Sequence, residues 1–116
     1  MVEKQDETNV RRGDVYWIKL DPTIGTETKK TRPAVIISND SQNKVRQRYI
    51  VAPITSVVKA VYPFEVKINI QEKPSKVMLD QIRTIDHRRL GRKLGSLSKE
   101  ELNHIERVLK IVLQIS

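Results

Sequence analysis

Short apolar runs, each ended by turn-forming residues, make up most of the chain before residue 98. β-Branched and aromatic residues dominate these runs, which is typical of strands. Pro53 is expected to end the third run, because proline cannot donate to a β-ladder. In the fourth run apolar and polar residues alternate, which predicts a half-buried strand. The extended segments predicted in this way are 15–20, 33–38, 48–52, 64–70, 77–85 and 93–97.

Two connections interrupt the pattern. Residues 21–31 contain Pro22, Gly25 and four threonines and have no apolar period, so they predict an exposed loop. This loop is long for a link between neighbouring strands, and long loops in compact domains are often functional. Residues 39–41 are expected to form a turn after the second strand.

The period changes to that of a helix at the C-terminal end. Ser98 and Glu101 form a capping box, and Leu97 and Leu102 flank it as a hydrophobic staple. The pattern predicts a helix over 98–116 that covers the core, and its broad apolar face leaves room for self-association. The apolar residues that follow at helical spacing are Ile105, Leu109 and Val112.

Five or six short strands followed by one helix cannot form a parallel βαβ sheet, because no crossover helices are present. We therefore expect a mainly β fold: a small antiparallel barrel over 13–97 with a C-terminal helix over 98–116. With 116 residues the chain suits one domain, placed at 11–116. Residues 1–10 are polar, lack apolar periodicity and are expected to be a flexible leader.

Composition narrows the possible functions. The chain has no cysteine and only two histidines, which excludes disulfides and thiolate metal sites and leaves no obvious metal cluster. No apolar run is long enough to span a membrane and the first residues do not resemble a signal peptide, so we expect a cytoplasmic protein. The net charge of +8 favours a polyanionic partner, although it also serves solubility. Aromatic residues are only 4%, which argues against a broad base-stacking platform.

Three segments carry candidate chemistry. Arg32 precedes Pro33, which holds it extended at a strand edge where its guanidinium can meet a phosphate; a plain surface arginine is the alternative. Thr55 and Ser56 follow a strand and can bind a phosphate or close a turn. In residues 80–86, Gln81 and Arg83 can face one way, with Asp86 as a further candidate, and contact unstacked bases, or form a solvated strand face.

The order of these segments resembles the MazF/PemK (Kid) toxins, and the resemblance runs from Arg11 to the C-terminal end. The blocks that carry it are Arg12-Gly13-Asp14-Val15-Tyr16, Thr31-Arg32-Pro33-Ala34-Val35-Ile36-Ile37-Ser38-Asn39-Asp40, Ile50-Val51-Ala52-Pro53-Ile54-Thr55 and Asp80-Gln81-Ile82-Arg83-Thr84-Ile85-Asp86.

The resemblance implies an SH3-like barrel of the CcdB/MazF/Kid type, a homodimer, and a toxin of a toxin–antitoxin system that cleaves single-stranded RNA, including mRNA, at short motifs. Attack by the 2′-hydroxyl would leave a 2′,3′-cyclic phosphate and a 5′-hydroxyl, without metal or cofactor. An acidic, MazE-like antitoxin would cover the RNA groove. Arg32 and Thr55 match the family's catalytic positions. The matching RNA-binding positions are Thr26, Glu27, Thr28, Lys29, Lys30, Ser56, Asp80, Gln81 and Arg83.

The sequence leaves several points open. A guanidinium stays protonated in proteins, so Arg32 fits charge stabilisation better than the role of general base, which is unassigned. His87 is followed by Arg88 and Arg89 and is expected at the surface. A CcdB-like gyrase poison is the first alternative, but the C-terminal tail lacks an aromatic residue. A non-catalytic RNA-binding barrel and a barrel that has lost its activity are the others.

Overall fold

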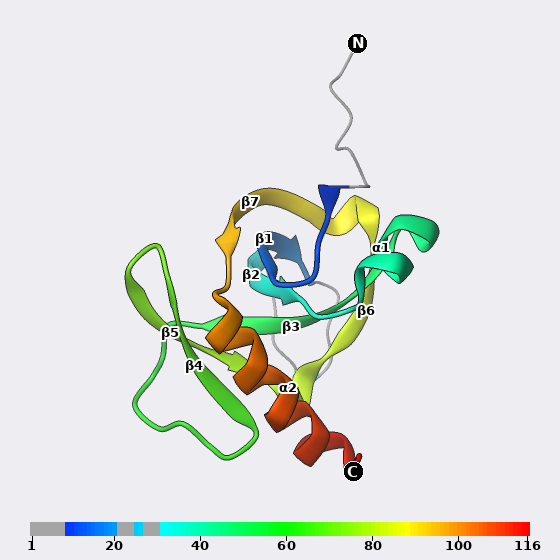
Figure 1. Cartoon of the computed structure of the whole chain (residues 1–116). Coiled ribbons are helices and arrows are strands. Elements are labelled where there is room, and N and C mark those ends of the chain that lie inside the picture. Colours follow the sequence, from blue (N-terminus) through cyan, green and yellow to red (C-terminus); the bar gives the residue numbers. More distant parts are fainter. Residues whose placement is uncertain (1–8, 21–24, 27–30) are drawn as a thin grey trace.

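The computed structural model of the chain describes residues 9–20, 25–26 and 31–116. The elements confirm the prediction of a mainly β fold with a C-terminal helix (Figure 1). They are β1 (Asp14–Lys19), β2 (Thr31–Ile36), α1 (Asp40–Arg46), β3 (Arg48–Thr55), β4 (Glu65–Ile70), β5 (Lys73–Met78), the 3-10 turn η2 (Leu79–Gln81), β6 (Arg83–Asp86), the 3-10 turn η3 (His87–Arg89), β7 (Leu90–Ser96) and α2 (Lys99–Leu113).

The strands form one curled antiparallel sheet in the order β4-β5-β3-β2-β1-β7, and β6 pairs with β3 beside this path. Both faces of the central strands are buried. Val15 and Val35 pack in a cluster that includes Ile105 of α2, whereas the adjacent Tyr16 and Ile36 pack in a second cluster on the opposite face. The continuous apolar run over 33–38 therefore belongs to a strand buried on both sides, as predicted.

The predicted end of the third strand at Pro53 is wrong, because β3 continues to Thr55. Ile50 O accepts from Ile37 N, so alternate residues of β3 bond toward β2, and Pro53 falls among those that face the opposite edge. On that edge β6 pairs only as far as Val51 and β5 pairs only from Ile54. The missing N–H of proline thus coincides with a gap in the ladder.

The same gap explains a second correction. The sequence predicts one extended stretch over 77–85, but β5 and β6 are separate strands joined by η2. Both pair with β3, so the chain follows one edge of β3 and leaves it opposite Pro53. There Leu79 turns into the core, where it is 0% exposed.

Helix α1 occupies the segment where we expected a turn at 39–41. Asn39 is the N-cap and its side chain accepts from Gln42 N at 2.8 Å. Asn43 bonds Ser38 through both its amide nitrogen and its amide oxygen, and this fixes the helix against the end of β2. Asn39 and Asp40 are common in turns but also begin helices, and the sequence alone did not separate the two.

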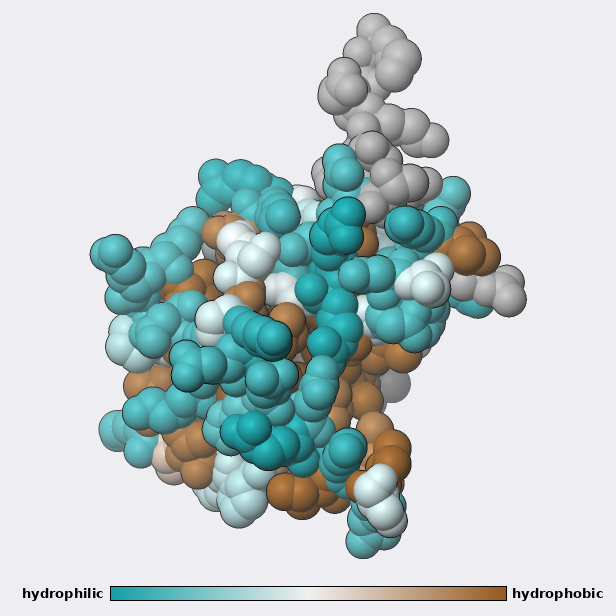
Figure 2. All heavy atoms as spheres, viewed as in Figure 1, coloured by the Kyte–Doolittle hydropathy of each residue, from teal (hydrophilic) through white to brown (hydrophobic). Residues whose placement is uncertain are grey.

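Helix α2 confirms the predicted capping box, with Ser98 and Glu101 bonded to each other's backbone N–H groups. The helix ends at Leu113 and not at Ser116, because Gln114 adopts a left-handed conformation (φ 56°). Figure 2 shows mostly hydrophilic residues over this face of the molecule and hydrophobic ones near the C-terminal end of α2. The exposed apolar side chains at that end include Ile111, Leu113 and Ile115.

The predicted leader lies mostly outside the described residues. Of its described part, Val10 is only 1% exposed and packs in the second cluster, so the packed chain begins at least one residue before the predicted boundary. Within the described ranges, no helix has the length and apolar character needed to cross a bilayer.

Candidate functional site

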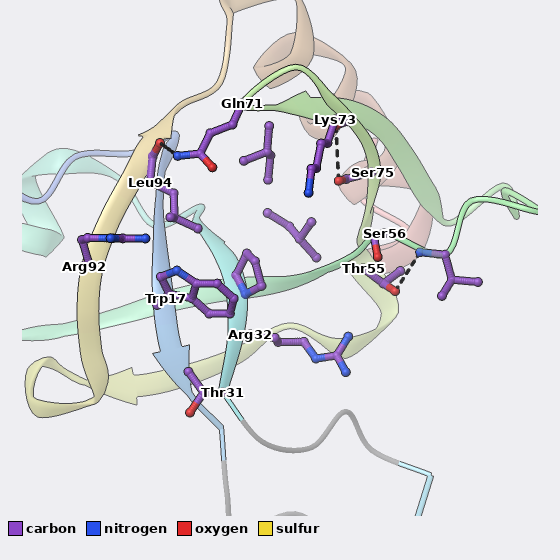
Figure 3. Close-up of a pocket in the computed structure, with 14 residues that line it drawn as sticks. Trp17, Thr31, Arg32, Thr55, Ser56, Gln71, Lys73, Ser75, Arg92 and Leu94 are labelled. Carbon is purple, nitrogen blue, oxygen red and sulfur yellow. Dashed lines mark hydrogen bonds between the residues drawn. The ribbon is translucent and has the colours of Figure 1, made fainter.

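A groove of about 520 Å³ opens at the end of β3, between the β4–β5 hairpin and β7 (Figure 3). It brings together Arg32, Thr55 and Ser56, three of the residues singled out from the sequence. Its described lining is Trp17, Thr31, Arg32, Pro33, Ile54, Thr55, Ser56, Val57, Ile70, Gln71, Lys73, Ser75, Arg92 and Leu94.

Arg32 and Thr55 lie at the same end of the groove (Figure 3). The paired part of β2 and β3 ends where Ala34 lies opposite Pro53, and Arg32 and Thr55 each lie two residues beyond this pair on their own strands. On the other edge of β3, Thr55 pairs with Lys76 of β5. Thr55 therefore lies between the strands that carry these two cations.

Arg32 is held at the start of β2 by the restriction that Pro33 places on its backbone. Its side chain is half-buried, and its Nε atom is buried with no hydrogen-bond partner among the described residues. A buried N–H without a partner costs about 1–3 kcal/mol, and a charged one costs more. Such a group is stabilised when an anion enters the groove and accepts its hydrogen bond.

Thr55 closes a turn and keeps its proton available. Its Oγ1 accepts from Val57 N at 3.2 Å, which is the turn-closing role that we set against phosphate binding. A threonine hydroxyl has one proton and two lone pairs, so accepting this bond leaves the proton free to donate. The two roles are compatible, and the bond to Val57 fixes the position of the oxygen. Ser56 is exposed beside it.

The groove is electropositive. Arg32, Lys73 and Arg92 line it, and none of its described lining residues is acidic. Neither Lys73 nor Arg92 makes an ion pair with another described residue. Three cations without a counter-charge in one concave site favour a polyanion, because a groove concentrates the field of its charges. No three His, Cys, Asp or Glu side chains in the described part of the chain are placed to hold a metal ion.

The loop that leaves the groove is anchored by a buried ion pair. Lys76 Nζ lies 2.8 Å from Glu65 Oε1 and donates to Ala60 O at 2.6 Å. The same carboxylate oxygen accepts from Tyr62 N at 3.0 Å. The loop between β3 and β4 is thus tied at Val57 by Thr55 and near its end by Lys76 and Glu65.

Other predicted contact residues lie outside this groove. Asp80 and Gln81 belong to η2, so the strict alternation that would align Gln81 with Arg83 is absent. Gln81 Nε2 lies 3.7 Å from Met78 Sδ, and Arg83 donates to Leu20 O at 2.9 Å. Thr26 is exposed in a turn. Glu27, Thr28, Lys29 and Lys30 lie outside the described residues.

His87 is half-buried, whereas we expected it at the surface. Its Nδ1 lies 3.1 Å from the hydroxyl of the buried Tyr49, and it does not line the groove. Shifted pKa values are found at Tyr16 and at the paired Asp86 and Arg88, whose carboxylate raises the pKa of the arginine. Burial, and next the charge of Asp14, raise the pKa of Tyr16 to about 12, so the phenol stays neutral at ordinary pH. The hydrogen bond from Arg88 lowers the pKa of the exposed Asp86.

The groove residues that were not predicted include Trp17, Gln71, Lys73 and Arg92. Trp17 lies in an ordinary apolar strand pattern, and Arg92 lies in a basic stretch with Arg88, Arg89 and Lys93. Gln71 and Lys73 lie at a hairpin tip whose position against β7 depends on the curl of the sheet. The sequence signals the cations but not the long-range packing that brings them together.

Comparison with known proteins agrees with this architecture. Residues 11–113 match the family described as the PemK-like, MazF-like toxin of type II toxin–antitoxin systems. Endoribonuclease EndoA of Bacillus subtilis (strain 168) is 39% identical over 111 residues, which cover 91% of this chain and 96% of EndoA.

Two solved structures extend the likeness. The MazF toxin of Deinococcus radiodurans superposes with a TM-score of 0.80 at 28% identity, covering 90% of this chain and 96% of that one. A MazE–MazF structure from the same organism gives 0.74 at 28% identity, covering 91% and 97%. The fold and the groove define a curled β-sheet protein with an electropositive site at a strand end. The chain belongs to the MazF/PemK toxin family.

Proposed function

We propose that the chain is an endoribonuclease toxin that cleaves single-stranded RNA, including mRNA, without a metal ion. The observation that carries this proposal is the buried, unpartnered Nε of Arg32 in a cationic groove beside the hydroxyl of Thr55. Membership of the MazF/PemK family and the likeness to EndoA, which is named an endoribonuclease, support the choice of RNA among polyanions.

The proposed reaction is internal transesterification. The ribose 2′-oxygen attacks the adjacent phosphorus and loses its proton to a base that we leave unassigned. The bond from phosphorus to the 5′-oxygen breaks, and that oxygen takes up a proton. The products are a 2′,3′-cyclic phosphate and a 5′-hydroxyl. The attacking hydroxyl belongs to the substrate, so the protein has to position the phosphate, stabilise its added charge and assist two proton transfers.

Arg32 and Thr55 divide this work. The guanidinium of Arg32 gains an acceptor for its buried N–H when the phosphate binds, and it stabilises the charge that accumulates in the transition state. We assign it the protonation of the leaving oxygen as well. Thr55, held by its bond from Val57 N, donates a hydrogen bond to a non-bridging phosphate oxygen.

The remaining RNA contacts are proposed around this centre. Ser56 lies next to Thr55 in the groove. Residues Thr26 to Lys30, together with Asp80, Gln81 and Arg83, are retained from the family resemblance as contacts for flanking nucleotides. Thr26 and the segment that carries Asp80, Gln81 and Arg83 lie outside the groove, which fits a strand of RNA that extends beyond it.

Two protein partners follow from the family. Solved relatives include an endoribonuclease in complex with its cognate antitoxin and a MazE–MazF structure. We propose that an acidic antitoxin segment silences this chain by occupying the same acid-free groove, because its charge would complement that of Arg32, Lys73 and Arg92. We also propose a homodimer. Cleavage of mRNA in the cytoplasm would inhibit translation and growth.

The test is incubation of purified protein with a long unstructured RNA in excess EDTA, followed by mapping of the product ends. We expect discrete cuts that end in a cyclic phosphate, slowed by about 10²–10³-fold in an Arg32→Ala variant. Sedimentation in the same buffer measures the dimer. Intact RNA after incubation with folded native protein would reject the nuclease and direct attention to gyrase inhibition or simple RNA binding.

A further inference from the structure

The end of the groove opposite Thr55 has an aromatic floor. Trp17 is half-buried, lines the groove and pairs in register with Pro33, so the two rings lie on neighbouring strands. Strand β7 passes close to this floor because Gly91 has no side chain: a Cβ there would lie 3.0 Å from Trp17 O. This close approach places Leu94 and Arg92 on the other side of the indole (Figure 3).

Two exposed cations stand around this floor. Arg92 extends from β7 and Lys73 from the first residue of β5, and both side chains point toward the groove in Figure 3. Neither has an ion-pair partner in the described part of the chain. They come from separate strands on separate sides of the floor. This arrangement suits a ligand with a flat apolar centre and negative charge at its edge.

An amide completes the rim. The β4–β5 hairpin turns through Gln71 and Glu72, both with positive φ (49° and 66°). Gln71 Nε2 donates to Leu94 O at 3.5 Å, which links the hairpin tip to β7. In Figure 3 the amide oxygen of Gln71 points toward the groove. An amide oxygen at the edge of an aromatic floor can accept from the amino group of a nucleobase.

We propose that this end of the groove is a nucleotide subsite. One unpaired base next to the scissile phosphate stacks on Trp17, Gln71 contacts the edge of that base, and Lys73 and Arg92 bind the flanking phosphates. The volume of about 520 Å³ lies within the range of about 300–1,000 Å³ typical of small-ligand sites. The inference rests on the proposed function, since it takes RNA as the ligand.

Binding at this subsite can be followed by tryptophan fluorescence, because Trp17 is the only tryptophan in the chain. The probes are short 2′-O-methyl oligonucleotides of A, C, G or U, which bind but lack the attacking hydroxyl. We expect them to quench Trp17 emission in the native chain. Trp17→Phe should bind within about threefold of native, measured by anisotropy of a labelled probe, and Trp17→Leu should bind about tenfold more weakly. Gln71→Ala should reduce the difference in affinity among the four probes.

The phosphate contacts are tested by salt dependence. For single strands each phosphate contact adds about 0.7 to the slope of log K against log salt, so Lys73→Gln/Arg92→Gln should lower the slope by about 1.4. The matched control is Lys44→Gln/Lys67→Gln, which removes the same charge from exposed residues that do not line the groove. Its slope should stay close to native.

The outcomes separate this inference from the proposed function. Cleavage in EDTA without any Trp17 response, or equal slopes for the two double variants, would overturn the subsite alone. Trp17 quenching with the expected slopes but no cleavage would support the subsite and reject the nuclease. A glutamate-rich peptide that binds and quenches Trp17 while the oligonucleotides do not would overturn the subsite in favour of an acidic protein ligand.

Discussion

Two basic side chains flank Thr55, and the structure treats them in opposite ways. Lys76, across the register on β5, is 7% exposed and is neutralised by Glu65, with a further bond to Ala60 O. Arg32, on the β2 side, has a buried Nε that no described residue accepts from. One cation is satisfied within the fold, and the other is satisfied only when something enters the groove.

The difference separates a structural charge from a functional one. A buried ion pair adds little net stability, because desolvation of the two charges offsets their attraction. Removal of one partner is strongly destabilising, because the other charge then stays buried without a counter-charge. An unpartnered N–H is different, because its cost is already present in the folded chain and its removal should not destabilise it. The functional role of Arg32 can therefore be distinguished from the structural role of Lys76 by measuring both stability and RNA cleavage in variants of each residue.

The largest effect is expected at Lys76. Lys76→Met leaves the carboxylate of Glu65 buried, and among the described residues it then keeps the bond from Tyr62 N alone, so the free energy of unfolding should fall by about 3–5 kcal/mol. The double variant Lys76→Met/Glu65→Met should return to within about 1 kcal/mol of native or exceed it. Urea denaturation measures both. Equal losses in the single and double variants would show that packing, and not the unpaired charge, is responsible.

At Arg32 we expect the reverse: a substitution that leaves stability unchanged but slows RNA cleavage. Arg32→Met removes the unpartnered N–H, so the free energy of unfolding should stay level or rise by about 1 kcal/mol, while RNA cleavage slows by about 10²–10³-fold. Arg12 is the matched control, since its guanidinium bonds Ile37 O and pairs with Glu106. Arg12→Met should lose about 1 kcal/mol. Comparable losses in both variants would mean that Arg32 is also a structural residue.

The smallest effect is expected at Tyr16, whose buried phenol is neutral in the folded chain. With the pKa of Tyr16 raised to about 12, the folded chain keeps this proton between pH 10 and 12, where the unfolded chain releases it. Stability from this group is complete below pH 10 and falls as pH rises through that window, by about 2–3 kcal/mol. Native and Tyr16→Phe proteins should differ in this slope when unfolding is followed by circular dichroism. Parallel pH profiles would contradict the shift.

Most of the fold could be predicted because its signals are local. The capping box at Ser98 and Glu101 and the apolar runs of β1 and β2 each fix an element within a few residues. Helix α1 was missed because its first residues also suit a turn, whereas the failures at Pro53 and Leu79 are long-range. Pro53 continues a strand only because two partner strands leave a gap opposite it, and Leu79 leaves the ladder at that gap. Neither event is visible in the residues themselves.

The site divides in the same way. Arg32 and Thr55 were candidates from their own sequence segments, the family resemblance predicted their catalytic roles, and both line the groove. Trp17, Lys73 and Arg92 were missed because three strands distant in sequence meet there only through the curl of the sheet. An aromatic residue and two cations without shared spacing give no signal until the hairpin and β7 are placed side by side.

The groove also has walls of unequal stiffness. Thr55 ends a strand that pairs along both edges, with β2 on one side and β6 and β5 on the other. Gln71 lies at a hairpin tip whose side chain bonds β7 at the long distance of 3.5 Å, between Gln71 Nε2 and Leu94 O. Amide hydrogens of β3 should therefore exchange slowly and those of the tip quickly. The end of β3, which is proposed to hold the scissile phosphate, would then stay fixed when RNA binds. The hairpin tip would adjust its position over the neighbouring base.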